Sequence, residues 1–489
     1  MPTTNLLGDI VVASLSAIKP ELFLGLTALI LLVHGVYRQQ RCNTGLVWIA
    51  VASLVFGVYL LINGMGANWT VMNTMLAASN YTALAKILVL VSTILVLLLS
   101  EAWLSEGEGK PFEFIILTLF SVIGMMLMIS ANDFLSVYMA LELSSLALYV
   151  LASFSRDHAK SSEAGLKYFV LGALASGMML FGISLIYGFT GSTGFETIKS
   201  LFSTPEAVAS KGVVVGLVLV IIGFCFKLSA APFHMWAPDV YEGAPTPVTA
   251  FFATAPKVAA LALLVRILLE PFGALIDEWQ QIIILVSILS MSVGALAAIM
   301  QTNIKRLLAY SSIGHAGFML MGLAAGNQAG VQAILIYLAL YIFMSAAAFG
   351  CVMLMKYDGH YVEDIKELRG LAQTRPLLAL MLAAVMFSMA GIPPLAGFFG
   401  KFYIVMALVE AQLMWLAVVG VTISVISCYY YLKVVKVMYF DEPAKRFDVG
   451  IPCALRVSLL LSTVVTVLFF LVPSPLIQQA KAAAEVLVP

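Results

Sequence analysis

Residues 212–235 read GVVVGLVLVIIGFCFKLSAAPFHM and contain one charged side chain, Lys227. A helix needs roughly 20 apolar residues to cross about 30 Å of hydrocarbon, so this run is long enough to span a membrane. Pro232 removes a backbone donor and clashes with the preceding turn, so the helix should break shortly after Lys227. The stretch therefore predicts a membrane-spanning helix that is interrupted beside a buried charge.

The composition of the whole chain supports a membrane protein. Of 489 residues, 62% are apolar and only 11% charged, with a mean hydropathy of +1.02. So few charges cannot form the surface of soluble domains. Lysine plus arginine equal aspartate plus glutamate at 26 each, which excludes the basic footprint of a nucleic-acid-binding protein.

Apolar runs of sufficient length recur along the chain and predict an all-α polytopic membrane protein with about 14 transmembrane helices. The stretch Ile10 to Ile18 has no basic segment before it and no clear cleavage site after it, so a removable signal peptide is not expected. The predicted spans are 20–38, 45–64, 81–100, 112–130, 132–155, 165–189, 212–235, 247–269, 281–301, 304–325, 329–355, 377–408, 411–438 and 452–473.

The basic residues predict the orientation, because short loops rich in lysine and arginine stay on the cytoplasmic side. Loops after odd-numbered spans carry 15 basic residues, whereas the two tails and the loops after even-numbered spans carry 4. Both termini are therefore expected outside the cytoplasm, which means the periplasmic side of a bacterial inner membrane.

Five charged residues lie inside predicted spans, away from the loops: Glu142, Lys167, Lys227, Lys257 and Lys401. A charge at the bilayer centre costs on the order of 2.5–3.5 kcal/mol, so each must face protein, water or a partner charge. A single such residue could form a structural salt bridge, but one carboxylate cannot neutralise four lysines, which favours a conduction path. Lys86 fits mid-membrane or a span end, and Arg266 and Arg456 lie near span ends, where they can reach the interface.

A second interrupted span is predicted at residues 387–401, FSMAGIPPLAGFFGK. A pair of interrupted helices is typical of inverted-repeat transporters. Aligning Phe226 with Phe387 places the two breaks 161 residues apart, although Lys227 precedes its break and Lys401 follows its own. Pro256 predicts a third kink. The expected division is 1–111, a first five-helix repeat 112–269, an inverted second repeat 270–438 and a last helix in 439–489.

Two histidines are further candidates for proton transfer, since imidazole donates and accepts near neutral pH. His234 follows Pro232, and His315 follows Ser311 and Ser312. A packing role for either histidine is equally open. His34 lies near a span end and has less support.

No motif in the chain indicates a redox or nucleotide site. The five cysteines, at 42, 225, 351, 428 and 453, form no CxxC pair, which argues against an iron–sulfur or zinc site made by this chain alone. They are read as small apolar residues. Gly188, Gly191 and Gly194 form GxxGxxG without a preceding strand, so a phosphate-binding loop is improbable.

Four stretches carry a resemblance to a known family: 226–257, FKLSAAPFHMWAPDVYEGAPTPVTAFFATAPK; 139–151, MALELSSLALYVL; 303–318, NIKRLLAYSSIGHAGF; and 391–402, GIPPLAGFFGKF. They resemble the antiporter-like proton-translocating subunits of respiratory complex I and their relatives in multisubunit Na+/H+ antiporters and membrane-bound hydrogenases. The resemblance covers nearly the whole chain. The span count leaves no room for the lateral helix of the largest such subunit, and Lys401 stands where the middle one carries glutamate.

The resemblance implies a role for each candidate residue. Lys227 would pair with Glu142, Lys167 would be a linking lysine, and Lys257 would be the central lysine. Lys401 would lie on the exit side, and His234 would stand beside the first break. At an effective dielectric of about 20 and a separation of about 6 Å, Glu142 and Lys227 would interact by roughly 2.8 kcal/mol, enough to gate proton binding.

The implied function is proton translocation along this row, driven by redox chemistry in other subunits. NAD, FMN, iron–sulfur clusters and quinone would then belong to partner subunits, with no cofactor in this chain. The expected partners are other membrane subunits, including sibling antiporter-like subunits, and lipid. The alternatives are a subunit of a Na+/H+ antiporter or hydrogenase-type complex, a stand-alone transporter, and a structural scaffold, against which the surplus lysines argue.

Overall fold

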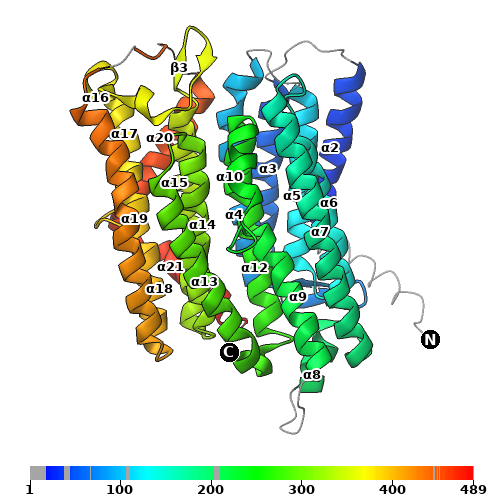
Figure 1. Cartoon of the computed structure of the whole chain (residues 1–489). Coiled ribbons are helices and arrows are strands. Elements are labelled where there is room, and N and C mark those ends of the chain that lie inside the picture. Colours follow the sequence, from blue (N-terminus) through cyan, green and yellow to red (C-terminus); the bar gives the residue numbers. More distant parts are fainter. Residues whose placement is uncertain are drawn as a thin grey trace.

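The computed structural model describes residues 18–37, 45–66, 68–105, 111–202, 210–443, 446–448, 450 and 452–487. Four of the 15 basic loop residues counted above, Arg38, Arg41, Lys110 and Lys445, lie outside the described residues, as do Cys42 and most of the stretch Ile10 to Ile18. The described chain is almost entirely helical and forms a single upright bundle (Figure 1). The all-α membrane fold is confirmed.

The helices follow the predicted spans closely. The first three are α2 (Lys19–Tyr37), α3 (Gly45–Asn63) and α4 (Asn80–Ser105). The next group is α5 (Pro111–Ser130), α6 (Phe134–Ala152), α7 (Ala159–Thr190), α8 (Phe195–Phe202), α9 (Lys211–Lys227), α10 (Trp236–Gly243), α11 (Thr246–Ala253) and α12 (Ala255–Leu269). The last group is α13 (Ile276–Ile299), α14 (Ile304–Ala324), α15 (Gln328–Val352), α16 (Leu371–Thr374), α17 (Pro376–Ala390), α18 (Ala396–Glu410), α19 (Met414–Phe440), α20 (Cys453–Leu468) and α21 (Ser474–Ala484).

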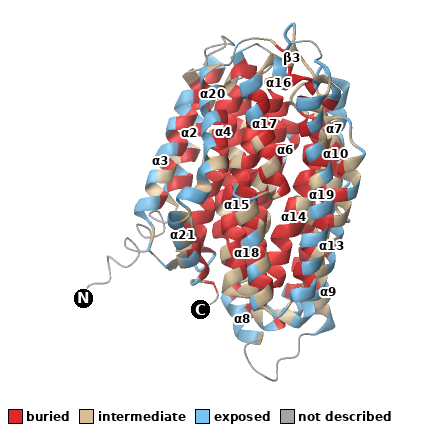
Figure 2. Ribbon diagram, turned by 90° about the vertical axis from the view of Figure 1, so that its left-hand side faces the viewer, coloured by how far each residue is buried: buried red, intermediate tan, exposed pale blue. Residues whose placement is uncertain are grey.

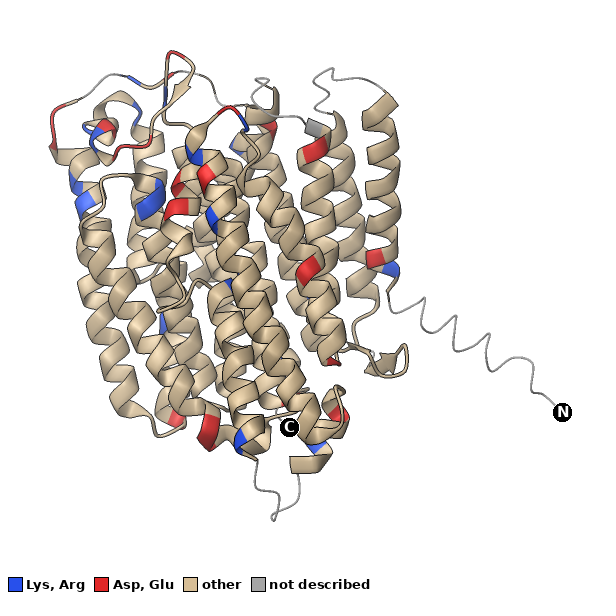
Figure 3. Cartoon of the chain, turned by 45° about the vertical axis from the view of Figure 1, so that its right-hand side comes forward, with Lys and Arg blue, Asp and Glu red and all other residues tan. Residues whose placement is uncertain are grey.

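The remaining elements lie in the connections. Two short hairpins, β1 (Trp69–Val71) with β2 (Leu76–Ala78) and β3 (Lys356–Tyr357) with β4 (His360–Tyr361), are antiparallel. Three 3₁₀ turns, η1 (Gly273–Leu275), η2 (Ile365–Leu368) and η3 (Phe469–Leu471), complete the described set. The β3–β4 hairpin, η2 and α16 mark one end of the bundle, here called the charged end, where Lys, Arg, Asp and Glu gather (Figure 3).

Burial separates an inner set of helices from an outer set. The helices α4, α12, α14 and α15 are buried along most of their length, whereas α2, α7, α19 and α20 bury only one side (Figure 2). The exposed sides carry large apolar residues such as Leu26, Leu174 and Val425. A helix that is apolar all round is stable at such an exposed position when its solvent is lipid.

The number of spans differs in one respect from the prediction. Twelve helical segments of the described chain are long and apolar enough to cross a membrane. The two predicted spans that do not qualify are 212–235 and 377–408, where α9 ends at Lys227 and α17 ends at Ala390. Both helices stop at the predicted breaks and are therefore too short to qualify as spans by themselves. The count of 14 spans stays a prediction. The third predicted kink lies at Thr254, between α11 and α12.

Arg266 does not extend to the interface as the sequence suggested. Its side chain is only 2% exposed, and it donates to the carbonyl oxygens of Ile129 and Ala131 at 2.9 Å. It also forms an ion pair with Glu270 at 2.9 Å. The guanidinium thus satisfies carbonyls left free where α5 ends, which is a structural role.

A group of backbone contacts recurs at a spacing of 170 residues. Asp133 caps α6 and forms a bridge with Gly194, while Asn303 caps α14 and forms a bridge with Asp364. Each cap closes an equivalent turn, because the side chain accepts hydrogen bonds from the amides two and three residues later. The two loops therefore have the same local architecture.

The close approach of neighbouring helices recurs at the same spacing. A Cβ on Gly124 of α5 would lie 2.6 Å from the amide nitrogen of Ser144 in α6, and one on Gly294 of α13 would lie 2.6 Å from that of Gly314 in α14. Small residues are used in this way where membrane helices pack by contact alone. Larger residues at either position would separate the pair.

Candidate functional site

Lys227 ends α9 and points to α6. Its Nζ donates to Ser145 Oγ at 2.7 Å and to Tyr149 OH at 3.3 Å. The helix stops here because Ser229 has φ 54° and the Ala230 amide turns back to the Cys225 carbonyl at 2.8 Å. Lys227 therefore holds its charge at the end of a helix, where the helix dipole favours a cation.

Glu142 lies one turn before Ser145 on α6 and has no direct bond to Lys227. Its Oε1 is buried without a hydrogen-bond partner in the described part of the chain. Ser145 and Tyr149 instead occupy the contacts of the lysine. The direct pair implied by the resemblance is thus replaced by a lysine bonded to two hydroxyls, with the carboxylate one helical turn away.

Lys257 lies in the first turn of α12, in the interior of the bundle. The residue is 4% exposed, and its Nζ donates to Ser312 Oγ of α14 at 2.7 Å. The ammonium also stands 5.9 Å from the centre of the Tyr241 ring. The break between α11 and α12 puts this charge against the neighbouring helix and removes it from lipid.

His315 follows Ser312 by one turn and links α14 to two further helices. Its Nδ1 lies 2.8 Å from Tyr337 OH of α15, and its Nε2 lies 3.2 Å from Tyr431 OH of α19. Tyr431 OH is also 2.5 Å from Ser311 Oγ. Lys257, through its contact with Ser312, and His315 therefore lie in series one turn apart along α14, and Ser311, the neighbour of Ser312, shares the Tyr431 hydroxyl with His315.

Lys401 comes after the second break in the sequence, but its ammonium group lies beside the end of α17 that precedes the break. Its Nζ donates to the carbonyls of Met389 at 3.1 Å and Ala390 at 2.9 Å, the last residues of α17, and to Ser424 Oγ at 2.8 Å. The ammonium stands 5.1 Å from the ring centre of Phe318, one turn after His315 on α14. Lys401 thus extends the series past His315.

The helix ends at the two breaks are similar in detail. The Ile392 amide turns back to the Phe387 carbonyl at 3.1 Å, as the Ala230 amide does to that of Cys225. These pairs correspond at a spacing of 162 residues, one more than the sequence alignment predicted. In this register Met389, whose carbonyl binds Lys401, corresponds to Lys227. Both ammonium groups therefore lie at equivalent helix ends, although the lysines differ in sequence position.

Aromatic rings separate Lys227 from Lys257. Tyr149 packs on Tyr168 at 4.8 Å between ring centres, Tyr168 stacks on Trp236 at 4.4 Å, and Trp236 contacts Tyr241 at 6.3 Å. In the described chain, several buried polar atoms close to this segment or to the nearby break have no protein partner. They are Ser176 Oγ, Ser229 Oγ, His234 Nδ1 and Tyr241 OH. Such atoms retain hydrogen-bonding capacity that water can use.

Lys167 is not part of this series. Its side chain is 40% exposed and forms ion pairs with Asp239 at 2.6 Å and Glu163 at 2.7 Å. The argument that the four lysines have only Glu142 to neutralise them is therefore wrong for Lys167, which has two other carboxylate partners. Asp239 also binds Arg306 at 2.7 Å. Burial raises the pKa of Asp239, but the bonds from Lys167 and Arg306 outweigh it, so this pKa lies below its ordinary value.

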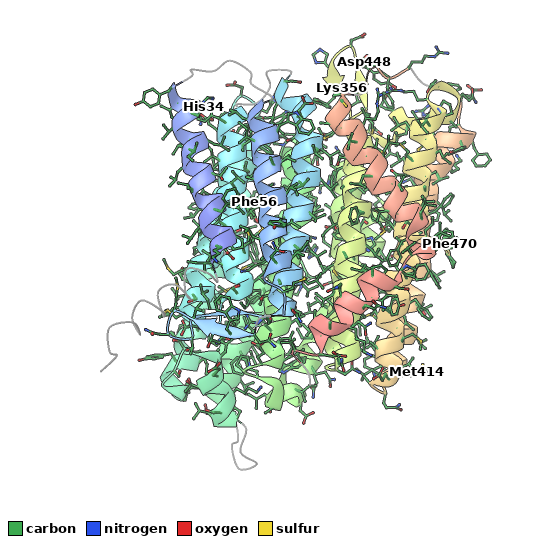
Figure 4. All side chains as sticks on the ribbon, turned by 180° about the vertical axis from the view of Figure 1, so that it is seen from behind. His34, Phe56, Lys356, Met414, Asp448 and Phe470 are labelled. Atoms are coloured by element: carbon green, nitrogen blue, oxygen red, sulfur yellow. The ribbon has the colours of Figure 1, made fainter. Side chains whose placement is uncertain are left out.

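The other three candidates lie away from the series. His234 is half-buried in the turn between α9 and α10, and no hydrogen bond joins it to a lysine in the described residues. His34 lies in the last turn of α2, at the charged end of the bundle (Figure 4). Lys86 forms a buried ion pair with Glu21 at 2.5 Å, so it has a structural partner that the sequence reading did not identify.

The hydroxyl groups that complete the site were missed. Ser145 and Tyr149 follow Glu142 at three and seven residues, a spacing that puts them on its face of a helix and could have identified them. Ser424 and Tyr431 of α19 gave no such signal, because their partners come from other helices.

Comparison with known proteins shows the same family over the full length. Residues 131–427 match the model of the NADH:quinone oxidoreductase/Mrp antiporter transmembrane family. NADH-quinone oxidoreductase subunit N of Paramagnetospirillum magneticum is 50% identical, covering 96% of this chain and 98% of that protein. A chain of respiratory complex I from Thermus thermophilus matches with a TM-score of 0.80 and 32% identity, covering 94% of this chain and 98% of that one. A chain of the Mrp complex from Dietzia reaches 0.83 at 22% identity, over 97% and 98%, which shows a shared fold alone.

Proposed function

Because the chain belongs to the NADH:quinone oxidoreductase/Mrp antiporter family, among the relatives of subunit N, we propose that it is the subunit of an NADH-quinone oxidoreductase that conducts protons across the membrane. The observation that carries this is the series of buried titratable groups that crosses the bundle from Lys227 to Lys401. An apolar interior has no structural need for three lysines and a histidine.

Proton transfer along the series uses groups that both hold and release a proton. Lys257 passes its proton towards His315 through Ser312, and Tyr431 and Tyr337 hold the imidazole by both nitrogens. Lys401 receives it at the second break. Glu142 biases Lys227, because a carboxylate one turn away favours the ammonium, and movement of that carboxylate releases the proton.

The charged residues act within two similar halves, 112–269 and 270–438, preceded by residues 1–111 and followed by 439–489. The recurring caps and glycine contacts support this division. An inverted second half puts one break on each side of the series, as expected for alternating access to the two membrane faces.

The redox chemistry belongs to other subunits in this proposal. NADH, FMN, iron–sulfur clusters and quinone are assigned to partners, and sibling antiporter-like subunits are the expected neighbours in a bacterial inner membrane. An Mrp-type antiporter is the alternative. The identity to subunit N relatives favours the oxidoreductase, because the likeness to the Dietzia chain is one of fold.

The test uses the purified complex in vesicles, with NADH-driven proton uptake and NADH-quinone activity measured together. Lys227→Ala should abolish uptake through this subunit while the complex assembles. Lys227→Arg keeps the charge but should not restore uptake, since arginine does not release its proton. Lys366→Ala, an exposed lysine at the charged end, is the control. Wild-type uptake by the Ala variant would exclude the proposed route, and an assembly without NADH-quinone activity would favour the antiporter.

A further inference from the structure

A serine of the second half binds the backbone at the first break. Ser290 of α13 is fully buried, and its Oγ accepts a hydrogen bond from the Ala231 amide at 2.8 Å. The same hydroxyl donates its proton to the Val286 carbonyl one turn earlier on α13, at 2.6 Å. The bond to Val286 fixes the orientation in which a lone pair of the hydroxyl meets the break.

The Ala231 amide depends on this acceptor. The amides of the three preceding residues, 228–230, turn back to carbonyls in the last turn of α9. The next amide, that of Ala231, bonds across to α13 instead, and the residue is only 1% exposed. A buried amide that loses its partner is costly, because no water replaces the bond. Since Lys227 lies four residues before Ala231, this bond ties the lysine end of α9 to the second half.

Helix α13 is itself packed tightly on α14, the helix that carries His315. A Cβ on Gly317, two residues after His315, would lie 2.8 Å from the Met291 amide nitrogen and 2.9 Å from the Ser287 carbonyl oxygen. The backbones of the two helices thus touch on either side of Ser290. Packing this close transmits a displacement. Ser290 therefore connects the first break to the part of α14 that carries His315.

The equivalent place in the other half has neither the donor nor the acceptor. In the register that aligns the two breaks, Ala231 corresponds to Pro393, which has no amide proton to donate. At the 170-residue spacing of the caps and glycine contacts, Ser290 corresponds to Phe120 of α5, which has no hydroxyl. A break of this shape therefore forms without the bond. This indicates that the bond at the first break serves to tie the two halves together.

We propose that Ser290 is a positioning residue, which holds the Lys227 end of α9 in a fixed relation to the proton-transfer groups on α14. This inference rests on the proposed function, because it concerns a proton that passes from one half to the other. Lys227 binds hydroxyls of α6 in the first half, whereas Lys257 binds Ser312 of the second. Without the Ser290 bond the break can move relative to α14, so the distance that the proton must cross is no longer fixed.

The experiment uses the whole purified complex in vesicles and measures NADH-driven proton uptake per assembled complex. Ser290→Ala should lower uptake about tenfold, the factor for one net hydrogen bond. Ser287→Ala is the matched control, because Ser287 is equally buried one turn earlier on α13 and its Oγ has no hydrogen-bond partner in the described chain. Ser458→Ala removes a buried bond between other helices, to the Leu95 carbonyl at 3.0 Å. Both controls should keep wild-type uptake.

A substitution at the donor tests whether the bond itself is responsible. Ala231→Pro removes the amide proton and copies the Pro393-Pro394 sequence of the second break. Ala231→Pro, Ser290→Ala and the double variant should have equal uptake, because one bond can be lost only once. Additive losses would show two independent effects, and recovery in the double variant would show that the amide only needed a partner. Either result would overturn the proposal.

Hydrogen exchange distinguishes failure of this inference from failure of the proposed function. Peptides across 228–235, followed by mass spectrometry, should exchange the Ala231 amide on the order of tenfold faster in Ser290→Ala and at the wild-type rate in Ser287→Ala. Unchanged exchange in Ser290→Ala would overturn the inference, as would normal uptake in this variant when Lys227→Ala has none. Normal uptake in both Ser290→Ala and Lys227→Ala would overturn the proposed function, and this inference with it.

Discussion

The hydroxyl of Tyr431 joins two parts of the series at the scale of single atoms. It contacts Ser311 Oγ at 2.5 Å and His315 Nε2 at 3.2 Å. Tyr431→Phe removes one oxygen and leaves both partners buried, which should cost about 1–3 kcal/mol of stability. Proton uptake should fall roughly tenfold, the factor for losing one hydrogen bond of about 1.4 kcal/mol.

Tyr81→Phe is the matched control for Tyr431→Phe. Tyr81 is fully buried, and its hydroxyl donates to the Ala262 carbonyl at 2.9 Å, outside the series. It should lose stability in thermal unfolding by a similar amount and keep its proton uptake. Equal uptake by the two variants would mean that the Tyr431 hydroxyl is structural.

Lys86 differs from the lysines of the series because it has a carboxylate partner. Lys86 and Glu21 are each 4% exposed and joined at 2.5 Å. Lys86→Ala leaves a buried carboxylate unpaired, so we expect a loss of about 3–5 kcal/mol in the free energy of unfolding. The double variant Lys86→Met with Glu21→Leu should recover most of it. Uptake per assembled complex should stay unchanged in both variants; its loss in the double variant would place Lys86 on the route.

At the scale of elements, the second break depends on a glycine. Gly391 ends α17 with φ 91°, and a Cβ there would lie 3.0 Å from Lys401 Cδ and 3.2 Å from its Nζ. Gly391→Ala should therefore cost about 1–2 kcal/mol for the left-handed backbone and also displace the ammonium from its carbonyl partners. We expect a clear loss of proton uptake.

Gly191→Ala separates the two effects of that substitution. Gly191 ends α7 with φ 73°, and a Cβ there would meet no atom within 4 Å. Its variant should lose similar stability, measured by thermal unfolding, with normal proton uptake. If both variants lost uptake equally, backbone strain would be responsible and the Lys401 geometry would not.

For the whole molecule, the sequence predicted the helices and their breaks because both depend on local chemistry. Apolar length sets a span, and proline or glycine ends it, so α9 and α17 stop where expected. Pairing across the bundle could not be predicted in this way. Asp239 lies 72 residues from Lys167, and Glu21 lies 65 from Lys86, so only the folded chain shows that these lysines are neutralised. Among the five lysines considered inside the spans, all of them in the described chain, Lys227, Lys257 and Lys401 have no carboxylate within ion-pair distance, and these three form the series.

The orientation of the whole molecule is the remaining prediction, and it depends on the uneven distribution of basic loops. In a background lacking the five native cysteines, Lys366→Cys would place a thiol at the charged end, and Ser200→Cys would place one in α8 at the opposite end (Figure 1). Both positions are exposed. An impermeant maleimide added to intact spheroplasts should label Ser200→Cys alone, and inside-out vesicles should reverse the pattern, because short basic loops are retained in the cytoplasm. The opposite labelling would place both termini in the cytoplasm and reverse the direction in which the series from Lys227 to Lys401 meets the two membrane faces.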